Sequence, residues 1–377
     1  MSELPWYRRH TIYVGDPSER TLCVVGDLDG DAVPEIVIGA RRPTEELFWL
    51  DRTQSGAWER YLMDRDCGQI EAGGALADLT GNGKLDFVAA HDADGDRIFW
   101  WEQPGDPTQR WIRHGIFQMP ANQSHDQFVG DLDGDGRPEL YFWNQGSGTL
   151  FWVPVPDDPR LSPWDGVLPV AMDVGREEGI AAADIDGDGH PDLVAGQSWY
   201  RLGADGTWER HRYAESYVST RLGVADFDDD GRAEIVLSEG DASFVRPEAP
   251  YGRLVYCRPG DDPEGMWNAT VLHDHLLDPH SLLVADFVGN GWPDVFVGEL
   301  GSPNGDHLHP PALRVFLNRG GTFREQIIDV GVGGTHEAKL IVLDLRLGIV
   351  GKPYRNLGTE APRGPDVDCV NLWLPED

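Results

Sequence analysis

The stretch GDLDGDGRPELYFW, residues 130–143, joins an acidic loop to an apolar, aromatic run. Asp131, Asp133 and Asp135 alternate with other residues, and Glu139 begins the apolar run. Gly and Asp are typical of tight turns, and a short run of aromatic and aliphatic residues is typical of a buried β-strand. The stretch therefore predicts an acidic turn that leads directly into a strand.

The same stretch recurs along the chain at intervals of about 50 residues, which indicates a repeat protein. The other copies are GDLDGDAVPEIVIG (26–39), ADLTGNGKLDFVAA (77–90), ADIDGDGHPDLVAG (183–196), ADFDDDGRAEIVLS (225–238) and ADFVGNGWPDVFVG (285–298). A seventh copy, KLIVLDLRLGIVGKPY (339–354), has lost most of the acidic loop. An aromatic segment and a further segment marked by Trp or Phe follow in most copies, so each unit contains four short predicted strands.

Four antiparallel strands per unit, repeated radially, are typical of a β-propeller blade. We therefore predict an all-β fold in which residues 1–377 form a single seven-bladed propeller domain. The chain ends on DCVNLWL, a third strand, and begins with PWYRRHTIYV, which has the pattern of a fourth strand. The N-terminal strand is thus expected to complete the last blade and close the ring. The predicted blades are approximately 20–63, 70–117, 124–171, 177–214, 219–272, 279–328, and 335–375 together with 6–13.

The composition is strongly acidic, with 31 Lys+Arg against 65 Asp+Glu and a formal net charge of -34. This charge argues against nucleic acid or an anionic membrane as a partner, because both are polyanions. The sequence shows no secretory signal and no apolar run long enough to span a membrane. Its four cysteines form no C-x-x-C pair, so we expect a cytoplasmic protein with reduced thiols.

The acidic loops predict bound calcium, since alternating oxygens suit a hard cation that takes six to eight oxygen ligands. Four blades keep the full set: Asp27, Asp29, Asp31 and Glu35; Asp131, Asp133, Asp135 and Glu139; Asp184, Asp186, Asp188 and Asp192; and Asp226, Asp228, Asp230 and Glu234. Blades 2 and 6 keep only Asp78, Asn82, Asp86 and Asp286, Asn290, Asp294. Because the loops recur wherever the backbone recurs, we interpret them as several structural Ca²⁺ sites. An acidic, solvated turn is the alternative.

Function is expected where the copies diverge. Six positions before the leading aspartate, blades 3 and 6 carry His125 and His280, and alignment of THEAKL places His336 at the same point of blade 7. This point is the start of the innermost strand, near one end of the central channel. Three converging imidazoles suit Zn²⁺ or a similar divalent transition metal with an open coordination position. A metal-free cluster of catalytic histidines is the alternative.

The loops between second and third strands should open on the same face, where binding sites usually lie. The candidate substrate-binding residues in these loops are Arg41, Trp143, Trp199 and Tyr354. The tryptophan rings could stack on a sugar, although Trp also recurs in this chain as part of the predicted blade core.

The acidic repeats resemble the calcium loops of FG-GAP or VCBS-type propeller repeats over essentially the whole chain. Four further segments resemble propeller enzymes of the aldos-2-ulose dehydratase type and propeller polysaccharide lyases such as ulvan lyases. These segments are WWEQPG (100–105), SHDQFVGDLDGDG (124–136), GTHEAKL (334–340) and VGKPY (350–354). In blade 7 the chain departs from the pattern, because the acidic loop is shortened to LDLRLGIV.

The resemblance implies a metal-dependent carbon–oxygen lyase or dehydratase that acts on a sugar or glycoside by β-elimination through an enolate. The implied metal ligands are His125, His280 and His336, with Glu337 or Glu299 as a further ligand or orienting group. Tyr200 or His91 would be the acid or base, and Arg221 or Lys352 would stabilise charge. The alternatives are an isomerase or epimerase that reprotonates the same enolate, and a non-catalytic propeller that binds a glycan or a protein.

Overall fold

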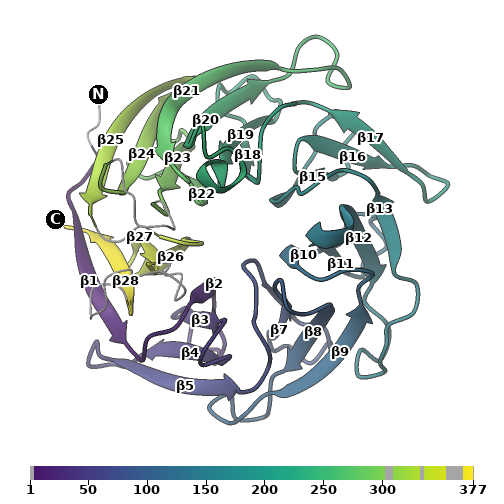
Figure 1. Cartoon of the computed structure of the whole chain (residues 1–377), viewed down its shortest axis with the longest axis vertical. Coiled ribbons are helices and arrows are strands. Elements are labelled where there is room, and N and C mark those ends of the chain that lie inside the picture. Colours follow the sequence, from purple (N-terminus) through teal and green to yellow (C-terminus); the bar gives the residue numbers. More distant parts are fainter. Residues whose placement is uncertain (1–3, 302–308, 332–334, 354–367, 377) are drawn as a thin grey trace.

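The computed structural model describes residues 4–301, 309–331, 335–353 and 368–376. These residues form seven four-stranded antiparallel sheets, arranged radially around a central axis that we call the channel (Figure 1). The predicted all-β fold and the seven-bladed propeller are therefore confirmed. The only helical elements in these ranges are the short η1 (Gln145–Ser147) and α1 (Ala242–Val245).

Each blade runs from an innermost strand at the channel to an outermost strand at the rim. Blade 1 consists of β2 (Arg20–Gly26), β3 (Glu35–Ala40), β4 (Leu47–Arg52) and β5 (Trp58–Asp64). Blade 2 consists of β6 (Ala75–Ala77), β7 (Asp86–Ala90), β8 (Arg97–Glu102) and β9 (Ile112–Gln118). Blade 3 consists of β10 (Ser124–Gly130), β11 (Glu139–Asn144), β12 (Thr149–Pro154) and β13 (Leu168–Ala171). Blade 4 consists of β14 (Ile180–Ala183), β15 (Asp192–Ala195), β16 (Ser198–Leu202) and β17 (Trp208–Arg212).

The remaining three blades follow the same order. Blade 5 consists of β18 (Thr220–Ala225), β19 (Glu234–Glu239), β20 (Tyr251–Arg258) and β21 (Asn268–Leu277). Blade 6 consists of β22 (Ser281–Ala285), β23 (Asp294–Gly298), β24 (Ala312–Arg319) and β25 (Thr322–Val330). Blade 7 consists of β26 (Lys339–Leu343), β27 (Arg346–Gly351), β28 (Cys369–Pro375) and the N-terminal β1 (Tyr7–Val14).

The hydrophobic core lies between neighbouring blades. The second strands read as continuous apolar runs, such as EIVIGA in β3 and DFVAA in β7, because both of their faces are covered by an adjacent sheet. One cluster joins Val37 and Trp49 of blade 1 to Phe87 and Trp101 of blade 2. Each blade therefore buries its apolar residues against its neighbours rather than within itself, so the ring is stable only as a whole.

Closure of the ring depends on β1, as the sequence predicts. This strand pairs antiparallel with β28 from Tyr7 opposite Pro375 to Val14 opposite Cys369. Next to this pair, the backbone N–H of Glu376 donates to the carbonyl oxygen of Trp6 at 2.7 Å, so residues 6 and 376 lie side by side at the rim (Figure 1). Blade 7 then packs against blade 1 through Ile341 and Val350 against Ile36 and Ile38, all of them buried. The seam is thus as apolar as the other blade interfaces.

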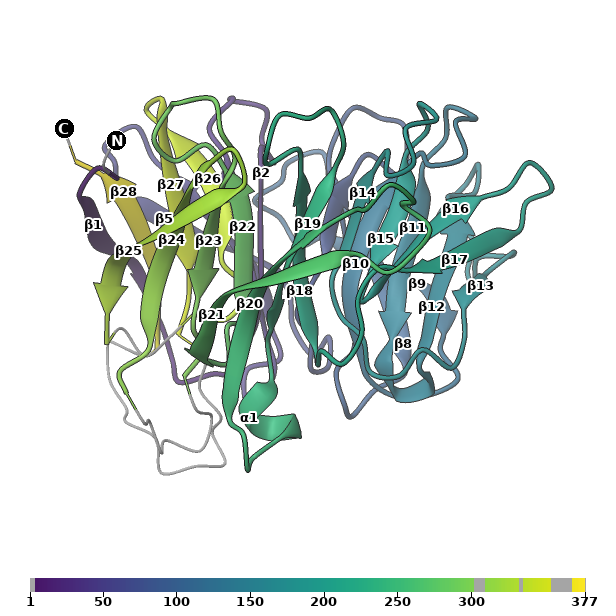
Figure 2. The same cartoon turned by 90° about the horizontal axis from the view of Figure 1, so that it is seen from above.

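The two faces of the ring carry different loops. The loops between first and second strands carry the acidic repeats on one face, and α1 projects from the opposite face (Figure 2). We call the end of the channel on the α1 face the channel mouth, because the innermost strands begin there. None of the helices that the structure describes is long and apolar enough to cross a membrane.

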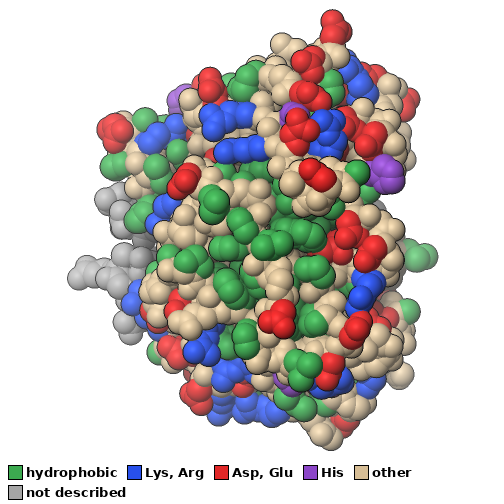
Figure 3. Space-filling model, turned by 90° about the vertical axis from the view of Figure 1, so that its right-hand side faces the viewer, with side chains coloured by type: hydrophobic (Ala, Val, Ile, Leu, Met, Phe, Trp, Pro, Cys, Tyr) green, Lys and Arg blue, Asp and Glu red, His purple; other side chains and the backbone are tan. Residues whose placement is uncertain are grey.

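The outer wall on the side of β13 and β17 carries exposed apolar side chains. Figure 3 shows hydrophobic side chains gathered in the middle of this wall, with charged side chains around them. In β13, which lies on this side of the ring, Leu168 is 54% exposed, and Met172 just beyond the strand is 64% exposed. This surface lies on the rim and takes no part in the site described next.

Candidate active site

The acidic loops form four groups that could hold a cation. In blade 3, one ligand atom from each of Asp131, Asp133, Asp135 and Glu139 lies within 4.8 Å of the others, and the described parts of blades 1, 4 and 5 show similar groups. Asp131 shapes the turn by accepting the backbone N–H groups of Gly134 and Gly136 at 2.8 and 2.9 Å. Burial and the Asp133 carboxylate raise the pKa of Glu139 to about 7. A bound cation would stabilise the ionised carboxylate of Glu139, which burial and Asp133 otherwise disfavour.

Blades 2 and 6 differ from these four in one hydrogen bond. In every blade except the seventh, the last carboxylate of the loop accepts a backbone N–H from the loop itself, as Glu35 does from Leu28 at 2.6 Å. In blades 2 and 6 its second oxygen also accepts a backbone N–H from the third-strand side, from Gln103 at 2.9 Å and Asn318 at 2.7 Å. In blades 1 and 5 the second oxygen is buried without a hydrogen-bond partner. In blades 1 and 5 the carboxylate oxygen without a hydrogen bond is suited to bind Ca²⁺. In blades 2 and 6 both oxygens of the corresponding carboxylate already accept hydrogen bonds.

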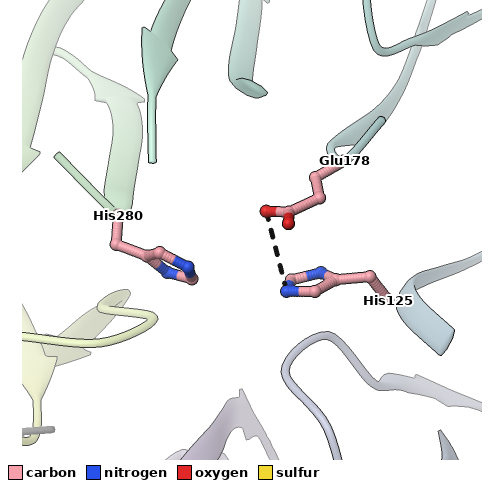
Figure 4. A group of neighbouring side chains, drawn as sticks. All are labelled: His125, Glu178 and His280. Carbon is pink, nitrogen blue, oxygen red and sulfur yellow. Dashed lines mark ion pairs between the residues drawn. The ribbon is translucent and has the colours of Figure 1, made fainter. Parts of the chain in front are cut away.

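At the channel mouth, four side chains from four blades converge. They are His125 at the start of β10, Glu178 just before β14, Arg221 in β18 and His280 just before β22, and all four are buried. Figure 4 shows the imidazole of His125 and the carboxylate of Glu178 facing each other, with His280 opposite. The Nε2 of His125 lies 3.7 Å from Oε2 of Glu178, and the ring centroids of His125 and His280 lie 6.1 Å apart.

Arg221 holds this cluster together. Its Nη1 lies 2.8 Å from Oε2 of Glu178, and its Nη2 lies 3.2 Å from Nε2 of His125 and 2.8 Å from Nε2 of His280. Its Nε also donates to the backbone carbonyl of His280 at 3.1 Å. One guanidinium group therefore contacts residues of three other blades at once.

The two histidines have opposite electrostatic environments. Although burial alone would lower the pKa of His125, the carboxylates of Glu178 and Asp126 raise it to about 9. Asp126 Oδ2 lies 3.0 Å from His125 Nδ1, which favours the imidazolium form. Burial and the nearby Arg221 lower the pKa of His280 well below its usual value. At neutral pH the site therefore pairs a protonated histidine with a neutral one.

The backbone at the channel mouth is strained where it positions these groups. Asp126 and Glu337 adopt φ values of 40° and 55°, in the left-handed region that non-glycine residues rarely occupy. A side chain at Gly73 would lie 2.5 Å from Cα of Asp126, so only glycine lets the two backbones approach. Asp126 Oδ2 in turn accepts the backbone N–H of Gly179 at 2.7 Å. Blades 2 and 4 thus fix Asp126 from both sides.

The predicted three-histidine metal site is rearranged in the structure. His125 and His280 contribute to a group that could hold a metal ion, but its third member is Glu178, with ligand atoms within 4.8 Å of one another. His336 instead stacks on His280 at 4.2 Å, and its Nδ1 lies 2.8 Å from the carbonyl oxygen of Thr21. Two imidazoles and a carboxylate suit Zn²⁺ chemically. However, the Arg221 guanidinium lies among these three donors, so a metal ion there would require Arg221 to move away.

Three other predicted residues stabilise the frame. Both oxygens of Glu299 accept backbone N–H groups, from Leu277 of blade 5 and Ala312 of blade 6, and Oε2 also pairs with Arg314, so Glu299 ties these two blades together and does not join the histidine cluster. Glu337 accepts the N–H of Cys23 at 3.0 Å and of Gly73 at 2.9 Å, which ties blade 7 to blades 1 and 2. Lys352 is fully buried and donates to the carbonyl groups of Thr21 and His336, and burial lowers its pKa to about 8.

The predicted aromatic substrate contacts are not on the surface. Trp143 and Trp199 are fully buried, and their indole N–H groups donate to the carbonyls of Gly179 and Pro263. Tyr200 is also buried, in a cluster between blades 3 and 4, and β16 is separated from the channel by β14 and β15. The repeat pattern places these rings in loops, but the strands extend further than the pattern indicates.

Two further predicted residues, Arg41 and His91, make contacts outside the cluster. Arg41 forms ion pairs with Glu71 and with Asp92, the latter at 2.7 Å. The Nε2 of His91 lies 3.0 Å from the carbonyl oxygen of Cys67. Tyr354 lies outside the described residues.

Sequence reasoning missed three acidic members of the site. Glu178 stands at the same repeat position as the histidines, so the alignment that found His125 could have found it. Asp126 is the residue after His125, and no feature of the repeat marks it as unusual. Asp241, whose Oδ1 lies 3.6 Å from Nε2 of His280, follows β19 in a loop that the repeat pattern does not constrain.

Comparison with known proteins agrees with the repeats and with the fold. A model of the FG-GAP-like repeat matches residues 78–142, 131–195 and 184–237. Cartilage acidic protein 1 of Mus musculus is 25% identical over 78% of the chain, and the match covers 50% of that protein. The chain therefore spans about half the length of this curated relative. The crystal structure of rhamnogalacturonan lyase YesW superposes with a TM-score of 0.50 at 14% identity, over 97% of this chain and 75% of that one. The chain thus carries FG-GAP-like repeats, and the last likeness concerns the fold alone.

Proposed function

We propose that this protein is a carbon–oxygen lyase that acts on a carbohydrate by β-elimination at the channel mouth. The observation that carries the proposal is the convergence of His125, Glu178, Arg221 and His280 from four separate blades. Folding of a propeller does not require four buried polar side chains at one point, and burying them is costly unless they serve a purpose. The likeness of fold to a rhamnogalacturonan lyase supports a carbohydrate as the substrate class.

In this proposal each member of the cluster has one role. His280, neutral at pH 7, accepts the proton from the carbon next to a carbonyl or carboxylate group. Arg221 stabilises the negative charge that then develops on the enolate oxygen. The C–O bond at the neighbouring carbon breaks as the C=C bond forms, and His125 donates its proton to the departing oxygen. After the product leaves, His280 releases its proton to solvent and His125 takes up a proton from solvent, which Glu178 and Asp126 favour by raising the pKa of His125.

The mechanism assigns no step to a transition metal, because a guanidinium group already supplies positive charge among the donors. A zinc ion bound by His125, Glu178 and His280 would stabilise the same enolate as a Lewis acid. Metal analysis distinguishes the two forms. Active protein without a stoichiometric transition metal supports the arginine form, and one equivalent of zinc in active protein would overturn it.

The test of the proposal is turnover of a panel of uronate-containing oligosaccharides, followed by the ultraviolet absorbance of the conjugated C=C product. We expect His280→Gln and Arg221→Lys each to lower kcat by about 100-fold or more. His275→Gln is the matched control, because His275 is exposed on blade 5. Solvent deuterium incorporated into unchanged sugar, with no absorbance, would instead indicate an isomerase or epimerase. Binding without any turnover or exchange would show a non-catalytic propeller.

A further inference from the structure

A polar cleft lies at the seam that closes the ring. It has a volume of about 480 Å³ and is formed by β1, the ends of β27 and β28, and the β4–β5 hairpin of blade 1. Its lining includes Arg8, His10, Arg52 and Arg346, in a chain whose net charge is -34. Since β1 and β5 are outermost strands, this cleft is on the rim, away from the innermost strands that carry the channel-mouth cluster.

The cleft contains more positive than negative charge. Arg8 pairs with Glu376 at 2.6 Å, while Arg52 and Arg346 share Asp344, at 3.0 and 3.6 Å. Three guanidinium groups are thus matched by two carboxylates, and His10 adds an exposed imidazole. Each guanidinium has five N–H donors, so these ion pairs leave donors for a further anion.

Apolar side chains line the same cleft between the charged groups. Trp58 is half-buried beside Leu372 and Leu374 of β28. An arginine rim suits carboxylate or phosphate groups, which accept paired N–H donors, and an indole suits the flat face of a ring. The volume lies within the range of ligand-binding clefts, about 300–1,000 Å³.

We propose that this seam cleft binds an acidic oligosaccharide, with its carboxylates on Arg8, Arg52 and Arg346 and a sugar ring on Trp58. The anionic character of the ligand follows from the cleft alone, whereas the choice of a sugar rests on the proposed function. The cleft is then a second binding site that holds the polymer while another segment of it, or of a neighbouring chain, reaches the channel mouth. A ligand that spans β1 and blade 1 also stabilises the closed ring.

Calorimetric titration with an oligogalacturonate, a neutral oligosaccharide of equal length and inorganic phosphate tests this proposal. We expect the oligogalacturonate to bind, to bind more weakly as salt rises, and to lose about tenfold in affinity, or about 1.4 kcal/mol, in Arg346→Ala. Arg346 suits the test because its ion pair with Asp344 is long and its side chain is 39% exposed, so its loss disturbs the fold little. Arg137→Ala, an exposed arginine of blade 3, is the matched control and should bind as the wild type does.

Two further variants separate the seam cleft from the channel mouth. Arg8→Ala/Arg346→Ala should abolish binding at the seam cleft while keeping the melting temperature, and Arg221→Ala should abolish turnover while keeping binding at the seam cleft. Undiminished affinity in the double variant, or binding lost only in Arg221→Ala, would overturn the seam site. Equal binding of the neutral sugar would overturn its anionic character, and tighter binding of phosphate than of oligogalacturonate would overturn the choice of a uronate. Seam binding without turnover of any sugar would contradict only the proposed function.

Discussion

Arg221 occupies a repeat position at which blades 1 and 6 carry the much shorter side chains of Leu22 and Ser281. At this position a long charged side chain reaches His280 of the neighbouring blade 6 and His125 of blade 3. The repeat alignment locates the position, but it cannot show that the side chain contacts residues of these other blades. For this reason the sequence predicts the histidines as metal ligands, whereas the structure surrounds them with an arginine and acids.

Gly73 is expected to be essential for the geometry of the site. Gly73→Ala places a Cβ against Cα of Asp126 and forces alanine to φ +101°, so we expect a loss of about 2 kcal/mol or more in the free energy of unfolding. Because Asp126 shifts with its backbone, turnover should fall further than the loss of folded protein explains. Gly105→Ala, in the same blade with open space around it, is the control. Chemical denaturation and kcat of the two variants check the prediction, which fails if they behave alike.

Lys352 should make stability depend on pH at alkaline values. Its pKa is about 8 in the folded protein and about 10.4 in an unfolded chain, so between these values the unfolded state binds more protons. The free energy of unfolding therefore gains a contribution that increases with pH over this window, up to about 3 kcal/mol. Lys352→Met removes this contribution.

Denaturation of the wild type and of Lys352→Met at pH 7 and pH 10 measures the effect. The wild type should gain stability relative to the variant as the pH rises. Lys84→Met is the control, since Lys84 also donates to two backbone carbonyls but is only partly buried. If the free energy of unfolding changes equally with pH in the wild type and in Lys352→Met, the lowered pKa of the buried Lys352 is contradicted.

At the scale of elements, the acidic loop is the unit that the sequence predicts best. Its pattern is local, because the ligands, the turn glycines and the following strand all lie within fourteen residues, as in 130–143. The spacing of the acidic residues alone therefore separates the full loops from the weaker loops. What the pattern could not show is the physical reason, which is a backbone N–H from Gln103 or Asn318 that occupies the last oxygen in blades 2 and 6.

This difference predicts how calcium removal affects stability. We expect about four bound Ca²⁺ ions, one for each loop whose ligand atoms lie within 4.8 Å of one another, and each should stabilise the folded state by about 2.7 kcal/mol at a concentration of 100 Kd. Glu139→Gln should lose one ion and melt lower in calcium, but not in a chelator. Asp86→Asn, the blade 2 counterpart, should keep the same number of ions. An equal loss in both variants would argue that the loops are not distinguished by their hydrogen bonds.

Strand lengths are harder to predict, because local backbone conformation decides them. The sequence places the start of blade 2 at residue 70, but β6 covers only Ala75–Ala77. The left-handed φ values of Gly73 and Gly74 interrupt the extended chain just before it. In blade 4 the strands around Trp199 and Tyr200 extend through a segment predicted as loop, so these rings are in the core.

At the scale of the whole molecule, closure is predictable because it follows from counting strands. Seven units of four strands leave one strand missing at the C-terminal end and one spare at the N-terminal end. The site is less predictable, since it depends on which side chains of different blades reach the channel axis. The repeat alone places His125 and His280 together, but it does not show that Glu299 stays outside the cluster, where Arg314 and two backbone N–H groups of blades 5 and 6 hold its carboxylate.

Removal of β1 should open the ring. A chain that begins after Val14 loses the partner of β28 and exposes the apolar seam between blades 7 and 1. We expect its melting temperature to fall by more than about 10 °C and its elution volume to indicate expansion or aggregation. The control is a circular permutant, in which a flexible linker joins the neighbouring termini and new ends are placed between β5 and β6. This permutant keeps every strand pair and should have a melting temperature close to that of the wild type. If the melting temperature falls equally in the truncated chain and in the permutant, an effect specific to the seam is contradicted.

The pairing of β1 with β28 also sets the order of events during synthesis. Residues 7–14 leave the ribosome before every other strand of the propeller, yet their partner, residues 369–375, is made after all the rest. The first strand must therefore wait, unpaired, through translation of all seven units. A nascent chain that ends before β28 cannot close the ring, so closure requires translation through residues 369–375.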